Sequence, residues 1–189
     1  MKIAFALTGS FCTHNKALAA LEEIIKNGYA VTPVFSEIVS STSTRFGGIK
    51  ALEEKVVSLC GKAVLKTIPE VEEEITAGGY GCVVVCPCTG NTLAKVAHGI
   101  TDTSVTMAVK AQLRNSLPVL LAPATNDALA GNLKNIGVCK DKKHLFFVPM
   151  AQDDFTKKPS SLVCDFTKVV PALKEAAEGR QLQPFFVKT

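Results

Sequence analysis

Residues able to bind an anion gather in four short segments, each of which directly follows an apolar run. Residues 8–15 contain a glycine with neighbouring hydroxyls, and residues 36–48 are rich in serine and threonine and include Arg45. Residues 87–92 and 123–127 each place an asparagine shortly after a proline. Hydroxyl groups with one guanidinium suit a single phosphate or carboxylate better than a polyphosphate. These four segments are the candidate binding loops.

The first segment, TGSFCTH, lacks the G-x-G-x-x-G pattern of dinucleotide-binding folds and the lysine of a P-loop. A helix N-terminus beside hydroxyl groups can still bind one phosphate through its backbone N–H groups. The alternative is that Ser10 and Thr13 only cap the helix that follows. For residues 36–48 the alternative is a solvated linker, because serine-rich loops are common.

The three histidines differ in how they lie relative to these loops. His14 falls within the first loop, so it is the candidate for proton transfer, and the alternative is a capping or solvent-exposed histidine. His98 is expected near a helix end, where it would interact with the helix dipole. His144 precedes a predicted strand and is expected to be exposed.

The seven cysteines are an odd number, which favours reduced thiols over a disulfide framework. Cys86 and Cys88 form the closest pair, but their spacing is tighter than that of the usual zinc-binding pairs, so we expect no metal site. Cys88 is either a thiol activated at a helix N-terminus or a small packing residue.

Elements that would hold these loops are predicted by the periodicity of apolar residues. Continuous apolar runs predict strands over residues 2–7, 30–35, 82–86, 118–122 and 145–148. Helical spacing predicts helices over residues 16–25, 48–59, 69–75, 93–100, 103–113, 126–133 and 166–177. Buried strands that alternate with helices imply an α/β fold whose parallel sheet is covered on both faces. Ligands of such sheets bind beyond the carboxyl ends of the strands, where the four loops begin.

Composition excludes several classes of protein. The chain has 189 residues, of which 47% are hydrophobic, and its formal net charge is +4, with no basic block to mark a nucleic-acid binder. No apolar run approaches the roughly 18 residues of a membrane span. The apolar start is too short for a secretory signal. We therefore expect one cytoplasmic domain over residues 1–189, with no membrane or nucleic-acid partner.

The third loop and the helix after it carry a family resemblance. Residues 86–102, CPCTGNTLAKVAHGITD, are similar to the P-A-T-x-N-T-x-A-K-x-A-x-G-I-x-D segment of the flavoproteins that include homo-oligomeric flavin-containing cysteine decarboxylases and flavin prenyltransferases. Residues 120–126, LLAPATN, resemble their P-A-M-N turn, and residues 8–10 match their first loop in position. Within this superfamily, the whole chain most resembles the B subunits of dipicolinate synthase.

This resemblance implies a single three-layer α/β/α, flavodoxin-like (Rossmann-like) domain. It also implies an FMN site between subunits and assembly into a trimer or dodecamer. Asn126 would lie near the substrate. The residues that the resemblance places around FMN are Gly9, Ser10, Ser36, Ser41, Thr42, Cys88, Thr89, Asn91 and Thr92.

Three departures separate the chain from the decarboxylases, and one of them is that no substrate-clamping C-terminal motif is evident. None of its histidines lies in the segment before the third-loop strand, where those enzymes carry a catalytic histidine. Thr125 replaces the methionine of the P-A-M-N turn. The resemblance therefore speaks against cysteine decarboxylation, while flavin binding remains expected.

The resemblance implies a sporulation enzyme of the mother-cell cytoplasm. With a partner A subunit that binds NAD(P), the chain would oxidise a dihydrodipicolinate-type intermediate of the lysine pathway to dipicolinate (pyridine-2,6-dicarboxylate). Candidate catalytic residues are His14, Arg45 and Asn126. Arg45 is the first candidate to bind a substrate carboxylate, and Lys16 and Lys95 are the next.

Two other functional classes remain open. The chain could be a stand-alone FMN-dependent decarboxylase or flavin prenyltransferase, active without a partner. It could also be a non-catalytic flavin-binding scaffold that stabilises the A subunit.

Overall fold

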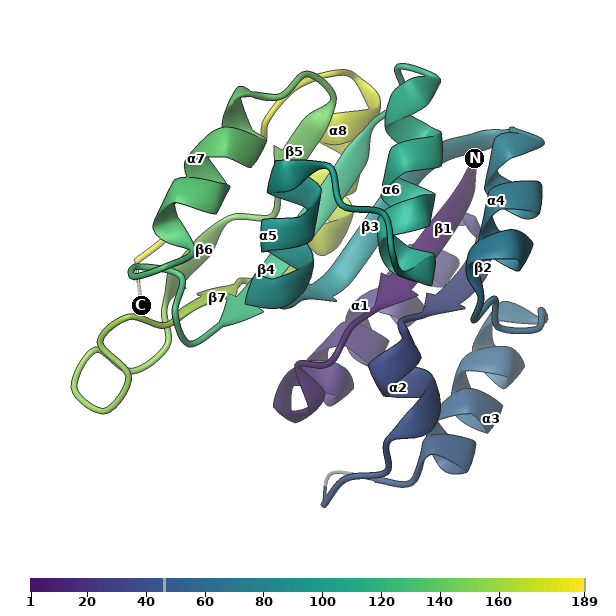
Figure 1. The fold of residues 1–189 in the computed structure, drawn as a ribbon, viewed down its shortest axis with the longest axis horizontal. Coiled ribbons are helices and arrows are strands. Elements are labelled where there is room, and N and C mark those ends of the chain that lie inside the picture. The colour runs from purple at the N-terminus through teal and green to yellow at the C-terminus, as the bar shows by residue number, and fades with distance from the viewer. Residues whose placement is uncertain (46, 189) are drawn as a thin grey trace.

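Five parallel strands form the main part of the sheet, which a computed structural model describes over residues 1–45 and 47–188 (Figure 1). Their spatial order is β2-β1-β3-β4-β5. The bounds are β1 (Lys2–Leu7), β2 (Ala30–Phe35), β3 (Tyr80–Cys88), β4 (Val119–Thr125) and β5 (Leu145–Phe147). The strand order reverses between β1 and β3, and the loops after these two strands therefore border the crevice in which such sheets bind ligands.

Helices cover both faces of this sheet because the strand side chains alternate between two apolar cores. Ala4 and Ala6 of β1 pack in the core beneath α4, α5, α6 and α7, whereas Phe5 and Leu7 pack in the core beneath α1, α3 and α8. Figure 1 shows α5, α6 and α7 in front of the sheet, with α1 and α8 behind it. The helices are α1 (His14–Lys26), α2 (Glu37–Ser41), α3 (Ile49–Cys60), α4 (Ile68–Thr76), α5 (Gly90–His98), α6 (Ser104–Arg114), α7 (Leu133–Asp141) and α8 (Val169–Ala177), with 3₁₀ turns η1 (Phe11–Thr13) and η2 (Phe166–Lys168). The three-layer α/β/α class is confirmed.

Two short strands extend the sheet in a way that the apolar runs did not predict. β7 (Leu162–Cys164) pairs antiparallel with the end of β4, and β6 (Met150–Gln152) pairs antiparallel with β7. The sheet is therefore mixed at this edge. Strands of three residues are too short to leave a periodic signal.

The helix predicted over residues 126–133 is wrong, and α7 begins where that prediction ends. Asp127 holds the segment in turns, because its carbonyl accepts from the amides of Ala130 and Asn132 over 3.0 and 3.1 Å. Its carboxylate accepts from the Asn132 side chain over 2.8 Å. Helical hydrogen bonding starts at Asn132, whose carbonyl accepts from the Ile136 amide over 3.0 Å.

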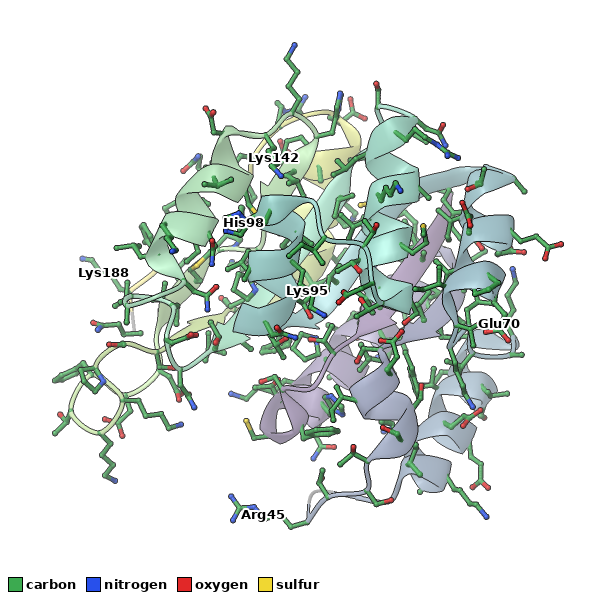
Figure 2. The ribbon with its side chains drawn as sticks, in the orientation of Figure 1. Arg45, Glu70, Lys95, His98, Lys142 and Lys188 are labelled. Atoms are coloured by element: carbon green, nitrogen blue, oxygen red, sulfur yellow. The ribbon has the colours of Figure 1, made fainter. Side chains whose placement is uncertain are left out.

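The helix predicted over residues 69–75 is confirmed as α4, which begins one residue earlier, at Ile68. Thr67 and Glu70 form a capping box in which the Glu70 carboxylate accepts from the Thr67 amide over 2.9 Å. Glu70 lies on the outer side of α4 (Figure 2).

Within residues 1–45 and 47–188, no helix combines the length and apolar character needed to cross a membrane.

Candidate functional site

All four predicted loops meet in one cleft of about 670 Å³ at the carboxyl end of the sheet. Gly9 and Ser10 line it from the first loop, Arg45 from the second, Thr89 from the third and Asn126 from the fourth. The remaining lining residues are Phe11, Cys12, Thr13, Lys16, Ala124, Thr125, Asp153, Lys158 and Val163. The volume falls within the roughly 300–1,000 Å³ that is typical of small-molecule sites.

Thr8, the first residue after β1, ties the first loop to the third. Its Oγ1 donates to the Pro87 carbonyl over 2.7 Å and accepts from the Thr89 amide over 3.1 Å. The residue is fully buried, with 1% of its surface exposed. These two bonds fix the spacing of the loops on either side of the strand-order reversal.

His14 stabilises the first loop through a hydrogen bond to its backbone. Its Nε2 lies 2.8 Å from the Thr8 carbonyl oxygen, and because a carbonyl only accepts, this nitrogen carries the proton. Burial lowers the pKa of His14, so the ring is neutral near pH 7. The ring lines a second cavity of about 210 Å³ together with Thr42. The alternative of a capping or solvent-exposed histidine is therefore wrong, and His14, the candidate for proton transfer, is not among the residues that line the cleft of about 670 Å³.

Two predicted cofactor-binding serines are not used to cap helices. Ser10 precedes η1 and Ser36 precedes α2, yet within the described part of the chain neither side chain makes a capping bond. Thr13 donates its hydroxyl to the Ser10 carbonyl over 2.8 Å instead of capping α1. Capping, the alternative raised for Ser10 and Thr13, is wrong in this structure.

Ser36 stands out because its hydroxyl is buried and unsatisfied. The residue is 6% exposed, and its Oγ has no hydrogen-bond partner among residues 1–45 and 47–188. A buried hydroxyl without a partner is costly. It lies beside the first loop, because the Ser36 amide donates to the Leu7 carbonyl over 3.0 Å. Ser36 is not among the residues that line the cleft, and the Ser40 and Ser161 hydroxyls are buried without a partner among the described residues as well.

At the start of α5, the hydroxyl groups of Thr89 and Thr92 in the third loop are hydrogen-bonded to each other. Thr89 Oγ1 accepts from the Thr92 amide over 3.3 Å and donates to Thr92 Oγ1 over 3.1 Å. Asn91 lies exposed on the first turn of α5. Cys88 is fully buried, and this burial raises the pKa of its thiol, which matches the packing alternative rather than an activated thiol.

The candidate binding residues of the second loop do not all lie in the same cavity. Part of it is the short helix α2, in which the exposed Ser41 donates its hydroxyl back to the Glu37 carbonyl over 2.8 Å. Thr42 lines the smaller cavity with His14. Arg45 lines the cleft, and Figure 2 shows its side chain at the outer end of the loop that follows α2.

Of the two lysines considered for carboxylate binding, only Lys16 reaches the cleft. It lies on the first turn of α1. Lys95 of α5 forms an ion pair with Asp102, in which Nζ and Oδ1 are 2.8 Å apart. Lys95 is not among the residues that line the cleft, and its charge is committed to Asp102.

The fourth loop is held by a small polar network packed on the start of α5. Thr125 Oγ1 donates to Asp127 Oδ1 over 2.6 Å, and Asn132 donates to Asp127 Oδ2 over 2.8 Å. Gly90 packs directly against these groups, since a Cβ at that position would lie 2.5–2.7 Å from Asn132, Thr125 and Asp127. Asn126, in the middle of this turn, is exposed in the cleft.

Asp153 and Lys158 line the cleft from the loop between β6 and β7, which was not among the four predicted loops. A signal was present, because residues 153–160 combine aspartate, proline and serine as turns do. The strands on either side of the loop were too short to be recognised.

Comparison with known proteins places the chain in a family. The Flavoprotein family profile matches residues 1–175. The B subunit of dipicolinate synthase from Bacillus subtilis is 38% identical over 187 residues, which cover 99% of this chain and 94% of that protein.

Solved structures agree with this assignment. The crystal structure of the dipicolinate synthase B subunit from Bacillus halodurans superposes with a TM-score of 0.91 at 33% identity, covering 100% of this chain and 96% of that one. The FMN-dependent cysteine decarboxylase TvaF shares the fold alone, with a TM-score of 0.67 at 20% identity over 94% of this chain and 98% of that one. The chain therefore belongs to the Flavoprotein family and, within it, to the dipicolinate synthase B subunits.

Proposed function

We propose that this chain is the B subunit of a dipicolinate synthase. Together with an A subunit it would oxidise a dihydrodipicolinate-type intermediate of the lysine pathway to dipicolinate, in the mother-cell cytoplasm of a sporulating bacterium. The near full-length similarity to the Bacillus subtilis protein of that name supports this proposal. The observation that carries it in the structure is the convergence of all four loops, with the cationic side chains of Lys16 and Arg45, on one cleft.

The cofactor of the proposed site is FMN, bound in the cleft by a single domain over residues 1–189. Gly9 and Ser10, which line the cleft, suit its phosphate, and the unsatisfied Ser36 hydroxyl lies beside the same loop, because the Ser36 amide donates to the Leu7 carbonyl. Thr89, Asn91 and Thr92 would lie near the flavin at the start of α5, together with the buried Cys88, while Ser41 and Thr42 would lie nearer the phosphate. When bound, FMN supplies a two-electron acceptor for redox chemistry.

The chain's own residues would hold the dicarboxylate. Arg45 and Lys16 supply positive charge for the carboxylates, and the Asn126 amide can donate to or accept from the ring substituents. His14 keeps Thr8, and through it the third loop, in place. Because Arg45 would contact the substrate directly, Arg45→Ala should raise KM for the dicarboxylate about tenfold or more. An unchanged KM would exclude this role for Arg45.

Cofactor binding is tested by the absorbance spectrum of the purified chain before and after FMN is added. A co-purified or saturable flavin band with a perturbed shape supports the site. A spectrum equal to free FMN at high concentration rejects it.

The contribution of each subunit to catalysis is tested by assaying each subunit alone and the two together. We propose that NAD(P) binds the A subunit and accepts the hydride, so that only the mixture forms dipicolinate. Turnover by this chain alone with FMN would indicate a decarboxylase or prenyltransferase instead. If the A subunit is active by itself and this chain only makes it more stable, the chain is a scaffold. Light scattering of the chain would measure the proposed trimer or dodecamer.

A further inference from the structure

The loop between β6 and β7 places two charged residues, Asp153 and Lys158, in the lining of the cleft. Hydrogen bonds within the loop hold its backbone. The Asp154 carboxylate accepts from the amides of Thr156 and Lys157 over 3.1 and 2.9 Å. The Lys158 amide donates to the Asp154 carbonyl over 2.7 Å. Gln152 closes the base of the loop with a 2.9 Å bond to the Pro159 carbonyl. Such a loop presents the Lys158 side chain from a defined position.

This loop is also attached to the fourth binding loop. The Leu129 amide donates to the Ser160 carbonyl over 2.9 Å, which joins it to the segment after Asn126. Figure 1 shows the β6–β7 loop projecting from the end of the sheet at which β4 also terminates. Asp153 and Lys158 therefore reach the same cleft as Lys16 and Arg45.

Lys158 and Asp153 form an ion pair that is close but partly open to solvent. Lys158 Nζ and Asp153 Oδ2 are 2.8 Å apart, while their side chains are 49% and 38% exposed. Pairs this exposed contribute little to stability. A second carboxylate can therefore replace Asp153 as the partner of Lys158 without disturbing the fold.

The charges that line the cleft favour an anionic ligand, and the cations come from separate segments of the chain. Lys16, Arg45 and Lys158 are cationic, and Asp153 is the one anionic side chain among the described lining residues. Lys16 and Arg45 come from the side of α1 and α2, whereas Lys158 comes from the β6–β7 loop. A ligand with one carboxylate would satisfy one side only.

We propose that Lys158 is a specificity-determining residue that binds the second carboxylate of a planar dicarboxylate, with Asp153 as the stand-in partner that the ligand displaces. This inference rests on the proposed function, because it assigns a residue to the same site. Lys158 thereby discriminates a pyridine dicarboxylate from the corresponding monocarboxylate.

The test compares the binding of dipicolinate and picolinate to the full chain supplied with FMN, by calorimetric titration at low ionic strength. Lys158→Gln should weaken dipicolinate binding about tenfold or more, because a charge-assisted hydrogen bond is lost, and change picolinate binding less than about threefold. Asp153→Asn should tighten dipicolinate binding, because the competing carboxylate is gone. The matched control is Lys157→Gln, which removes the same charge from the same loop at a position outside the cleft lining.

Three results would overturn the inference: no dipicolinate binding to the unmodified chain, equal loss for both ligands in Lys158→Gln, or an equal effect of Lys157→Gln. The coupled assay with the A subunit separates this from the proposed function. If the unmodified mixture forms dipicolinate while Lys158→Gln binds it normally, only the role of Lys158 fails. If dipicolinate binding depends on Lys158 but the mixture forms none, the proposed function fails and the dicarboxylate site stands.

Discussion

At the scale of single residues, two buried hydroxyls near the cleft have opposite roles. Thr8 uses its side chain for two bonds between loops, whereas the Ser36 hydroxyl has no partner among residues 1–45 and 47–188. A threonine and a serine at the end of neighbouring strands look alike in sequence. Only their surroundings make one a structural tie and the other a candidate ligand group.

Replacing Thr8 by valine should keep its shape and remove both bonds. The buried Pro87 carbonyl and Thr89 amide would lose their partner, so the free energy of unfolding should fall by about 1–3 kcal/mol. Urea titration of Thr8→Val measures this change. The control is Thr156→Val on the exposed β6–β7 loop, which should stay within about 0.5 kcal/mol. An equal effect of the two variants would show that the Thr8 bonds contribute nothing specific.

Replacing Ser36 by alanine should act differently with and without FMN. Without FMN, removal of an unsatisfied buried hydroxyl should leave the free energy of unfolding unchanged or raise it by about 1 kcal/mol. With FMN, the variant should bind more weakly, because the proposed phosphate contact is lost. Parallel urea and flavin titrations measure both effects. A loss of stability without FMN would contradict the unsatisfied state of this hydroxyl.

At the scale of elements, the packing of the start of α5 against the fourth loop fixes the relative position of two loops that line the cleft. Gly90 begins α5 and contacts the network of Thr125, Asp127 and Asn132 without room for a side chain. A glycine lets another segment approach the backbone closely, because it has no Cβ. The group that approaches is the protein's own fourth loop.

Two glycine-to-alanine changes with opposite expected signs test this packing. Gly90→Ala should lower the free energy of unfolding by about 1–3 kcal/mol, because its Cβ overlaps fixed polar atoms. Gly137→Ala, in the interior of α7 with no atom near the added Cβ, should raise it by about 0.5–1 kcal/mol through helix propensity. Thermal unfolding of both variants provides the measurement. A tolerated alanine at position 90 would show that the contact is loose.

At the scale of the whole molecule, stability depends on keeping His14 neutral. Burial places the pKa of His14 below its ordinary value of 6.5 in the folded chain. The unfolded chain therefore takes up a proton first as the pH falls, and each such proton favours unfolding. The Lys66 and Thr67 amides lower the pKa of Glu70, and hydrogen bonds from Lys2 and Tyr80 lower the pKa of Glu74. The stabilising contacts of these two carboxylates are therefore lost only below about pH 4.5.

The free energy of unfolding should therefore decline as the pH falls from about 6.5 towards about 5, before the carboxylates titrate. His14→Gln should remove most of this slope, because glutamine can still donate to the Thr8 carbonyl but does not titrate. Urea titrations at several pH values compare the two proteins. Equal slopes would mean that His14 is not the titrating group.

Much of the architecture follows from local patterns. The five parallel strands were predictable, because continuous apolar runs bounded by turn residues reflect burial on both faces of a sheet. The start of α4 was predictable from Thr67 and Glu70, because a capping box is contained within four residues. The predicted helix over residues 126–133 failed, because Asp127 folds that segment into turns with bonds that periodicity does not register.

The fold class, the four binding loops and the family follow from the amino-acid sequence alone, since each depends on residue types within a short window. Which of those residues share a cleft follows only from the folded chain. Thr8 meets Pro87 from 79 positions away, and Lys158 reaches the cleft from an edge whose strands are only three residues long. Whether a side chain is buried, paired or open to a ligand depends on chain segments that come together only on folding.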